Sequence, residues 1–189
     1  MRKLVLLMHV SLDGFVAGPN GEMDWIKADD ELFDLVGEFT SEGDAALYGR
    51  KTFQMMEQYW PTAGDQPDAS KHAREHSAWY KSAEKYVASG TMKAGVFSNT
   101  TFFADNIPAE VRRVKEMPGE KILMIGSPST VHALLPHKLI DEYRLFLNPV
   151  ILGAGIPLFT TVEHRSMLNL EGTTPFASGV VGIHYTVKQ

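Results

Sequence analysis

The sequence predicts an α/β fold whose sheet is mostly parallel and ends in an antiparallel hairpin at its C-terminal edge. Up to about Leu135, short apolar runs typical of strands alternate with segments whose apolar residues recur at helical spacing. After that point only strand patterns follow. Alternating strands and helices form parallel sheets, whereas consecutive strands form hairpins. The 189 residues show no linker or repeat, so a single domain over 1–189 is expected.

The first half of the chain begins with an apolar run that predicts a buried strand. The elements expected up to residue 103 are a strand over 4–10, a loop over 11–22, a helix over 29–40, a short strand over 45–48, a helix over 51–58, a strand over 85–89, and strand pieces over 96–98 and 100–103. Asp29 or Asp30 could cap the first helix. The segment 60–82 is polar and holds two prolines, which predicts a surface excursion with a short helix.

The second half contains two helices and then only strands. The expected elements are a helix over 108–116, a strand over 122–125, a helix over 129–135, a strand over 142–149, a turn over 153–157, and strands over 166–171 and 180–188. Pro108 suits a first helical turn. Pro118-Gly119 ends that helix and Pro136 stops the next one.

The composition excludes several classes of partner and chemistry. The net charge is −5 and no long basic run occurs, so nucleic acids and anionic membranes are poor partners. The absence of cysteine excludes disulfides, thiolate metal sites and cysteine nucleophiles. No segment approaches the ~20 apolar residues of a membrane helix, and the apolar run 4–10 lacks the cleavage site of a signal peptide. A cytoplasmic protein is expected.

Two strand-to-helix turns carry most of the functional information. Gly49-Arg50-Lys51-Thr52 follows the strand-like run 44–48, and a turn rich in hydroxyl groups, 126–131, follows the apolar run 121–125. Helix N-termini attract phosphate through free N–H groups and the positive end of the dipole. Two such turns predict a nucleotide cofactor, and Arg50 with Lys51 favours NADP over NAD. The alternative is a solvated helix start, but cations are disfavoured at a helix N-terminus without an anion.

Two other motifs are set aside. Gly153-Ala154-Gly155 is followed by no helix, so a turn is favoured over a dinucleotide site. His72 and His76 lie four residues apart without the glutamate that zinc proteases require after the first histidine. An exposed helix is expected there, and no metal site is predicted.

The order of short motifs resembles a known superfamily. The motifs are Ser11-Leu12-Asp13-Gly14-Phe15-Val16-Ala17, Trp25, Gly49-Arg50-Lys51-Thr52, Ser89-Gly90-Thr91, Ile125-Gly126-Ser127, Leu139-Ile140-Asp141-Glu142-Tyr143 and the run 149–159. Together they resemble the dihydrofolate-reductase-like superfamily. Within it the chain is similar to stand-alone proteins related to the C-terminal reductase domain of the bifunctional riboflavin-biosynthesis deaminase/reductase. The resemblance implies a three-layer fold with a mostly parallel eight-stranded sheet, and NADPH lying across the carboxyl ends of the strands.

The resemblance also implies a set of cofactor-binding residues. Gly49, Arg50, Lys51 and Thr52 would hold the adenosine side, with the two cations at the 2′-phosphate or pyrophosphate. The other implied contacts are Ser89 and Thr91 at the ribose phosphate, Gly126, Ser127, Ser129, Thr130 and Val131 at the pyrophosphate, and Val16 and Ala17 at the nicotinamide. One departure is that Gly126 is followed by Ser127-Pro128, where the family often has a second glycine.

The acceptor side is less well defined. Asp13 and Asp30 are the candidate acids that could assist hydride transfer by hydrogen bonding or proton donation. The alternatives are that Asp13 bonds its own turn beside Gly14, and that Asp30 only favours a helix start. Trp25 is expected to form a wall of the substrate pocket, with a loop anchor as the alternative.

The function implied is that of an NADPH-dependent reductase of a small heterocyclic substrate. The nearest implied activity is reduction of 5-amino-6-(5-phosphoribosylamino)uracil, without the deaminase half, because no zinc-ligand motif occurs. Dihydrofolate reductase activity and a non-catalytic NADPH-binding sensor remain the alternatives. A homodimer paired through the C-terminal strands is expected, because relatives in this group pair in that way.

Overall fold

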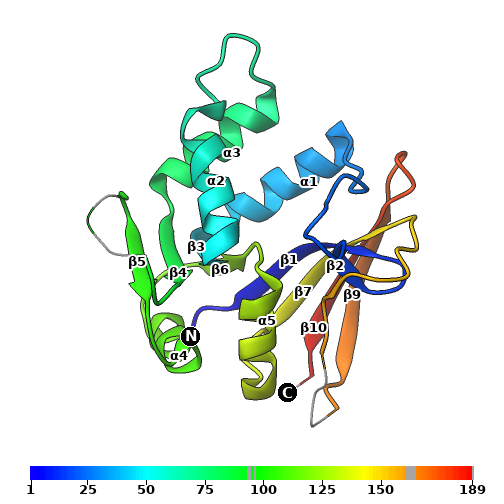
Figure 1. The fold of residues 1–189 in the computed structure, drawn as a ribbon. Coiled ribbons are helices and arrows are strands. Elements are labelled where there is room, and N and C mark those ends of the chain that lie inside the picture. Colours follow the sequence, from blue (N-terminus) through cyan, green and yellow to red (C-terminus); the bar gives the residue numbers. More distant parts are fainter. Residues whose placement is uncertain (93–94, 96, 161–164, 189) are drawn as a thin grey trace.

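An eight-stranded sheet forms the centre of the computed structural model (Figure 1). The structure describes residues 1–92, 95, 97–160 and 165–188, so residue 96 of the strand piece predicted over 96–98 lies outside the described residues. In sheet order the strands are β5 (Thr100–Phe103), β4 (Glu84–Ala88), β3 (Gly43–Gly49), β6 (Lys121–Met124), β1 (Leu4–Ser11), β7 (Glu142–Asn148), β10 (Val181–Val187) and β9 (Leu168–Pro175).

The six strands from β5 to β7 run parallel, and the last two do not. β1 lies between β6 and β7 and is parallel to both. β10 pairs antiparallel with β7, and β9 pairs antiparallel with β10. This arrangement confirms the predicted fold class. The carboxyl ends of the parallel strands therefore meet at one edge of the sheet.

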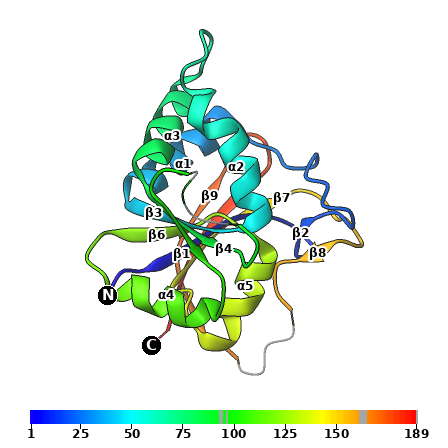
Figure 2. The same ribbon diagram turned by 60° about the vertical axis from the view of Figure 1, so that its left-hand side comes forward.

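Helices cover both faces of this sheet, which makes three layers (Figures 1 and 2). They are α1 (Asp30–Ser41), α2 (Arg50–Ala63), α3 (Lys71–Ser82), α4 (Ile107–Glu116) and α5 (Pro128–Leu134), with a 3₁₀ turn over Leu135–His137. α4 and α5 bury Val111, Val114 and Val131 against one face. α1 buries Leu32 against Leu7 on the opposite face, where α2 and α3 also pack.

The segment 60–82 differs from its prediction as a surface excursion. α2 continues through Pro61 to Ala63, and α3 is a full twelve-residue helix. α3 buries Ala73, His76 and Tyr80, which share one helical face. The apolar face of α3 is hard to recognise in the sequence, because a histidine takes one of the positions that apolar residues usually occupy. The expectation that His76 is exposed is therefore wrong: it is 5% exposed and lies against Trp60 with ring centroids 3.9 Å apart.

A second, two-stranded sheet was not predicted. β2 (Phe15–Ala17) lies within the expected loop 11–22, and it pairs with β8 (Ile156–Pro157), where a turn was expected. The pairing joins segments about 140 residues apart, so no local pattern reveals it. β9 also extends to Pro175, beyond the predicted end at residue 171. No helix among the described residues is long and apolar enough to cross a membrane.

Candidate active site

Two helices begin side by side at the carboxyl edge of the sheet. Gly49 is the N-cap of α2, and its N–H donates to the carbonyl oxygen of Gly126, 3.3 Å away, directly before α5. A Cβ at position 49 would lie within 2.8 Å of the Ser127 Cβ and of the Thr130 Oγ1, and still closer to the Ser127 Oγ. Only glycine allows this approach. Gly126 has a φ of +74°, a conformation that also favours glycine.

Both helix starts lack a side-chain cap. At Gly49 and Ser127 no side chain accepts a hydrogen bond from a backbone N–H of the helix, and neither helix has an acidic residue in its first turn. The Ser127 hydroxyl instead lies 2.9 Å from the Ser129 Oγ and 3.3 Å from the Thr130 Oγ1. The first-turn N–H groups and this hydroxyl cluster therefore offer hydrogen-bond donors at one place.

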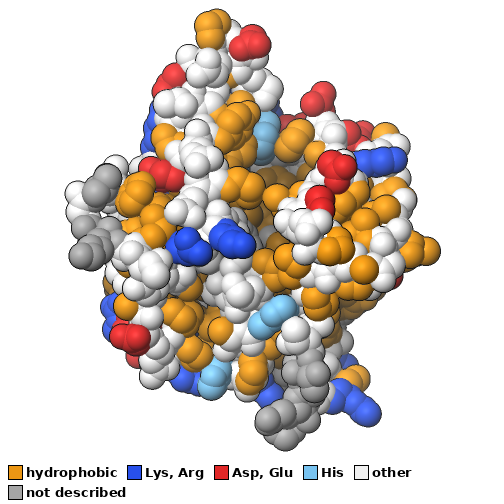
Figure 3. Space-filling model, in the orientation of Figure 1, with side chains coloured by type: hydrophobic (Ala, Val, Ile, Leu, Met, Phe, Trp, Pro, Cys, Tyr) orange, Lys and Arg blue, Asp and Glu red, His pale blue; other side chains and the backbone are white. Residues whose placement is uncertain are grey.

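The start of α2 carries positive charge. Arg50 and Lys51 are exposed, and neither forms an ion pair with any residue that the structure describes. Figure 3 shows basic side chains over this end of the helix. Two cations beside the positive end of a helix dipole are electrostatically unfavourable on their own. An anion bound here would relieve that repulsion.

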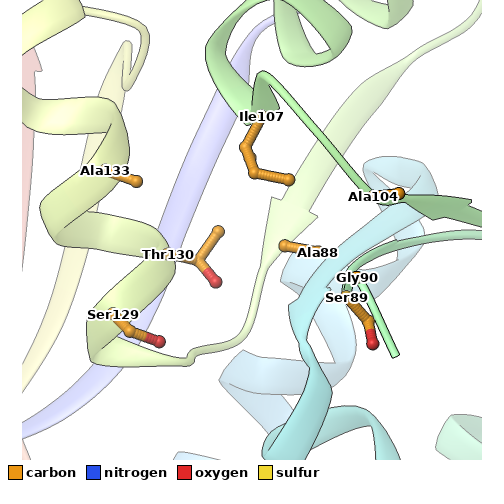
Figure 4. A pocket seen from close by; sticks show the side chains of 8 residues that line it. All are labelled: Ala88, Ser89, Gly90, Ala104, Ile107, Ser129, Thr130 and Ala133. Atoms are coloured by element: carbon orange, nitrogen blue, oxygen red, sulfur yellow. The ribbon is translucent and has the colours of Figure 1, made fainter. Parts of the chain in front are cut away.

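A pocket of about 240 Å³ lies beside the start of α5 (Figure 4). Ser129, Thr130 and Ala133 of α5 form one wall, and Ile107 projects between the walls. The opposite wall is formed by Ala88, Ser89, Gly90 and Ala104. Ser89 is buried, and its hydroxyl accepts from the N–H groups of Thr91 and Met92. Ser89 therefore shapes the loop after β4, while the side chain of Thr91 is exposed.

The segment that follows β1 is tied to the loop before β8. Val16 and Ala17 are both buried within β2. The Asp13 carboxylate accepts from the Ser11 hydroxyl at 2.7 Å and from the N–H groups of Leu152 and Gly153 at 3.1 and 2.7 Å. The Ser11 hydrogen bond is the main reason that the pKa of Asp13 lies below its usual value. The carboxylate therefore ties the turn after β1 to the loop before β8, and its role as a candidate acid stays a prediction.

Asp30 and Trp25 lie at the entrance to α1. Asp29 is the cap, because its carboxylate accepts from the Leu32 N–H at 2.9 Å, and it also accepts from Ser178. Asp30 follows as an exposed residue of the first turn. Trp25 is half-buried and donates from its indole to the carbonyl oxygen of Glu22. The contacts of Trp25 fit a loop anchor, and Asp30 occupies a position favourable for the helix dipole.

A hollow separates the α2 side of the molecule from the loops around β2, and hydrophobic side chains gather around it (Figure 3). Large apolar residues are exposed on two of the helices that cover this face of the sheet, namely Phe33 on α1 and Met55 and Tyr59 on α2. A hollow of this kind suits a flat heterocycle better than a highly charged ligand.

The sequence reasoning missed two polar residues at the carboxyl ends of β1 and β7. Asn148 is fully buried, and its amide nitrogen lies 3.2 Å from the Nδ1 of His9. Burial lowers the pKa of His9 to about 4, so the ring is neutral at pH 7. The available clue was a histidine within an apolar strand, two residues before its end. The described residues contain no cluster of His, Asp and Glu suited to a metal ion.

Comparison with known proteins places this chain in a family. The model of the family described as the RibD C-terminal domain matches residues 2–182. The uncharacterized protein YyaP of Bacillus subtilis (strain 168) is 39% identical over 184 residues, which cover 97% of this chain and 94% of that protein.

Solved structures share the fold. A putative riboflavin biosynthesis protein from Shewanella sp. PV-4 superposes with a TM-score of 0.72 at 20% identity, covering 99% of both chains. A diaminohydroxyphosphoribosylaminopyrimidine deaminase/5-amino-6-(5-phosphoribosylamino)uracil reductase from Thermotoga maritima gives a TM-score of 0.67 at 16% identity, covering 99% of this chain and 57% of that one. The chain belongs to the RibD C-terminal domain family and has its reductase-like fold.

Proposed function

We propose that the protein is an NADPH-dependent reductase of a small heterocyclic substrate related to 5-amino-6-(5-phosphoribosylamino)uracil. The observation that carries this proposal is the pair of uncapped helix starts, with Arg50 and Lys51 left without ion-pair partners among the described residues. Membership of a reductase family supports it. The named uracil comes from the printed activity of the Thermotoga maritima protein.

The residues present fit the cofactor. The first-turn N–H groups of α2, together with the Ser127 and Ser129 hydroxyls, would hold the pyrophosphate, because they offer donors where neither helix has an acidic residue in its first turn. Arg50 and Lys51 would hold the 2′-phosphate, which distinguishes NADP from NAD. The pocket between Ser89 and Ala133 would take the adenosine side. When bound, NADPH supplies the hydride, and the protein orients it and excludes water.

The cofactor preference tests this proposal. Replacing Arg50 with Ala removes a charge-assisted hydrogen bond, which typically contributes about 1.5–3 kcal/mol. NADPH affinity is expected to fall by roughly tenfold or more, with NADH affinity unchanged. Titration of both nucleotides by intrinsic fluorescence measures this. Arg112→Ala, a change at an exposed arginine of α4, serves as the control and leaves both affinities as they are.

Turnover separates the reductase from its alternatives. NADPH oxidation with a substituted uracil supports the proposal, and oxidation with dihydrofolate alone supports dihydrofolate reductase activity. NADPH binding without oxidation across both acceptors supports a sensor. Equal affinity for NADPH and NADH in the wild type, or no binding of either, contradicts the cofactor assignment.

We also propose a cytoplasmic homodimer that pairs through β9 and β10. Leu170 and Met167 are 58% and 56% exposed on and beside β9, which offers an apolar surface for a second copy. Light scattering at micromolar concentration is expected to give twice the 21.0 kDa mass of one chain. Leu170→Glu is expected to yield monomers, and a wild-type monomer would refute the dimer.

A further inference from the structure

The strand β1 places a histidine at the carboxyl edge of the sheet. In β1, Leu4, Leu6 and Val10 pack on the α4 and α5 face, whereas Leu7 packs on the α1 face. His9 follows this alternation to the α1 face, where its ring lies 5.0 Å from that of Phe146. It is only partly buried, unlike most of β1. His9 lies directly before Val10, near the carboxyl end of β1. The turn that follows is held by Asp13.

The hydrogen bonds of Asn148 determine which nitrogen of His9 carries the proton. The Asn148 Oδ1 accepts from the Lys27 N–H at 2.9 Å, so the amide oxygen is already used. The Asn148 Nδ2, which can only donate, faces the Phe146 carbonyl at 3.0 Å and the His9 Nδ1 at 3.2 Å. The Nδ1 of His9 must therefore accept. In the neutral ring the proton then lies on Nε2, an assignment that follows from the network.

The protonated nitrogen points away from this network and has no partner. The Nε2 makes no hydrogen bond to any residue that the structure describes, and it is not among the buried polar atoms that lack a partner. The atom therefore keeps some exposure to solvent, although the residue is partly buried. The ring thus presents an oriented N–H donor at the edge where the ends of β1 and β7 meet.

We propose that His9 is a substrate-binding residue, whose Nε2–H donates a hydrogen bond to a carbonyl oxygen or an unprotonated ring nitrogen of the heterocycle that is reduced. This inference rests on the proposed function and adds the class of acceptor: an uncharged ring with an exposed C=O or C=N group. In the overall reaction a hydride from NADPH adds to the carbon of that group and a proton from water adds to its oxygen or nitrogen. His9 keeps its own proton and stabilises the negative charge that develops on the heteroatom.

Burial of the ring serves this role. The pKa of about 4 keeps His9 neutral at pH 7, so the donor does not attract carboxylates or phosphates into the acceptor site. Under this proposal Arg50 and Lys51 bind the phosphates of the cofactor, and His9 binds an uncharged part of the substrate. His9 lies against Phe146, which in turn packs against Phe39 and Phe176, so the donor stands on an apolar face of the sheet.

The first experiment measures the histidine nitrogens directly in the intact wild-type chain. Long-range ¹H–¹⁵N spectra, assigned with His9→Gln, are expected to show the Nε2–H form at neutral pH. On addition of NADP⁺ with either 5,6-diaminouracil or dihydrofolate, the Nε2 signal of His9 should shift, while that of the exposed His137 stays in place. An Nδ1–H form, or a His9 signal that responds to neither probe, overturns the inference.

Variants supply the second arm. His9→Phe keeps a ring against Phe146 but removes the donor, and His9→Gln restores a donor; thermal unfolding checks that both fold. With a turning-over acceptor, His9→Phe is expected to lower kcat/KM by about tenfold or more, and His9→Gln to recover part of that loss. NADPH affinity should remain within about twofold, because the phosphate contacts are elsewhere. Equal kcat/KM in His9→Phe and wild type refutes the role of His9. If the wild type does not bind NADPH at all, the proposed function is refuted instead.

Discussion

The helices of this protein begin in two different ways. α1, α3 and α4 each start with a side chain that caps the helix, as Asp29 accepts from Leu32, Ser70 from Ala73 and Asn106 from Ala109. α2 and α5 start at Gly49 and Ser127 without such a bond. The capped helices α1 and α4 also carry acidic residues in their first turns, whereas α2 carries Arg50 and Lys51.

Capped helix starts have a side-chain partner for a first-turn N–H group, whereas uncapped starts leave these groups available to a ligand. A cap satisfies N–H groups that would otherwise face water and stabilises the helix by about 1 kcal/mol. α2 and α5 lack that stabilisation, and their starts touch through the hydrogen bond from Gly49 to Gly126. The uncapped donors are therefore concentrated at a single point of the surface, which is where an anionic cofactor would replace the missing caps.

The largest expected effect comes from separating the two uncapped starts. Gly49→Ala places a Cβ against Ser127 and Thr130, and such overpacking costs typically about 1–3 kcal/mol. The variant should also lose NADPH binding, because the added Cβ forces the starts of α2 and α5 apart. The control is Gly37→Ala within α1, where the nearest atom would be 3.8 Å away. That change should raise stability by about 0.5–1 kcal/mol. Denaturant unfolding and nucleotide titration measure both, and normal NADPH binding by Gly49→Ala would contradict the arrangement.

Two N-cap serines allow a matched test. Ser70→Ala removes the cap of α3 and should lower the free energy of unfolding by about 1 kcal/mol without changing NADPH affinity. Ser127→Ala removes a hydroxyl that caps nothing, so the loss of stability should be smaller while NADPH affinity falls. Denaturant unfolding and NADPH titration of both variants measure these two effects. If the two serines behave alike, the distinction between capped and uncapped starts has no functional meaning.

The smallest effect has opposite signs for folding and binding. Lys51→Glu places an acid in the first turn of α2, which should stabilise the apo protein by about 0.3–1 kcal/mol through the helix dipole. The same carboxylate repels phosphate, so NADPH affinity should fall. Thermal unfolding with and without NADPH shows both effects in one experiment. A variant that is less stable than wild type in the absence of nucleotide would be the contrary result.

The fold was largely predictable because its determinants are local. Apolar runs such as 4–10 and 121–125 are buried strands in the structure, and the prolines expected at the start of α4 and after α5 lie there. The failures arose where tertiary contacts decide. α3 buries His76 among tryptophans, and β2 pairs with a strand 140 residues away. Neither fact has a counterpart in a short window of sequence.

The candidate site was predictable only in part, for a similar reason. Turns such as 49–52 can be recognised from their composition. The structure brings the two predicted turns together at Gly49 and Gly126. The roles of Asp13 and Asp30 depend on which backbone groups approach them, and that information is absent from the residues alone. His9 was overlooked because its orientation depends on Asn148, which lies 139 residues further along the chain.

The position of β1 in the sheet has a consequence for how the chain folds. Its two neighbours, β6 and β7, pair with it through Leu4 with Ile122 and Val5 with Glu142, so both partners lie more than a hundred residues downstream. During synthesis this very apolar strand would wait unpaired until most of the chain had emerged. Sheets of such long-range, parallel pairing form slowly and expose aggregation-prone surface in the meantime. Overproduction at high temperature should therefore yield inclusion bodies sooner than the stability of the finished protein would suggest.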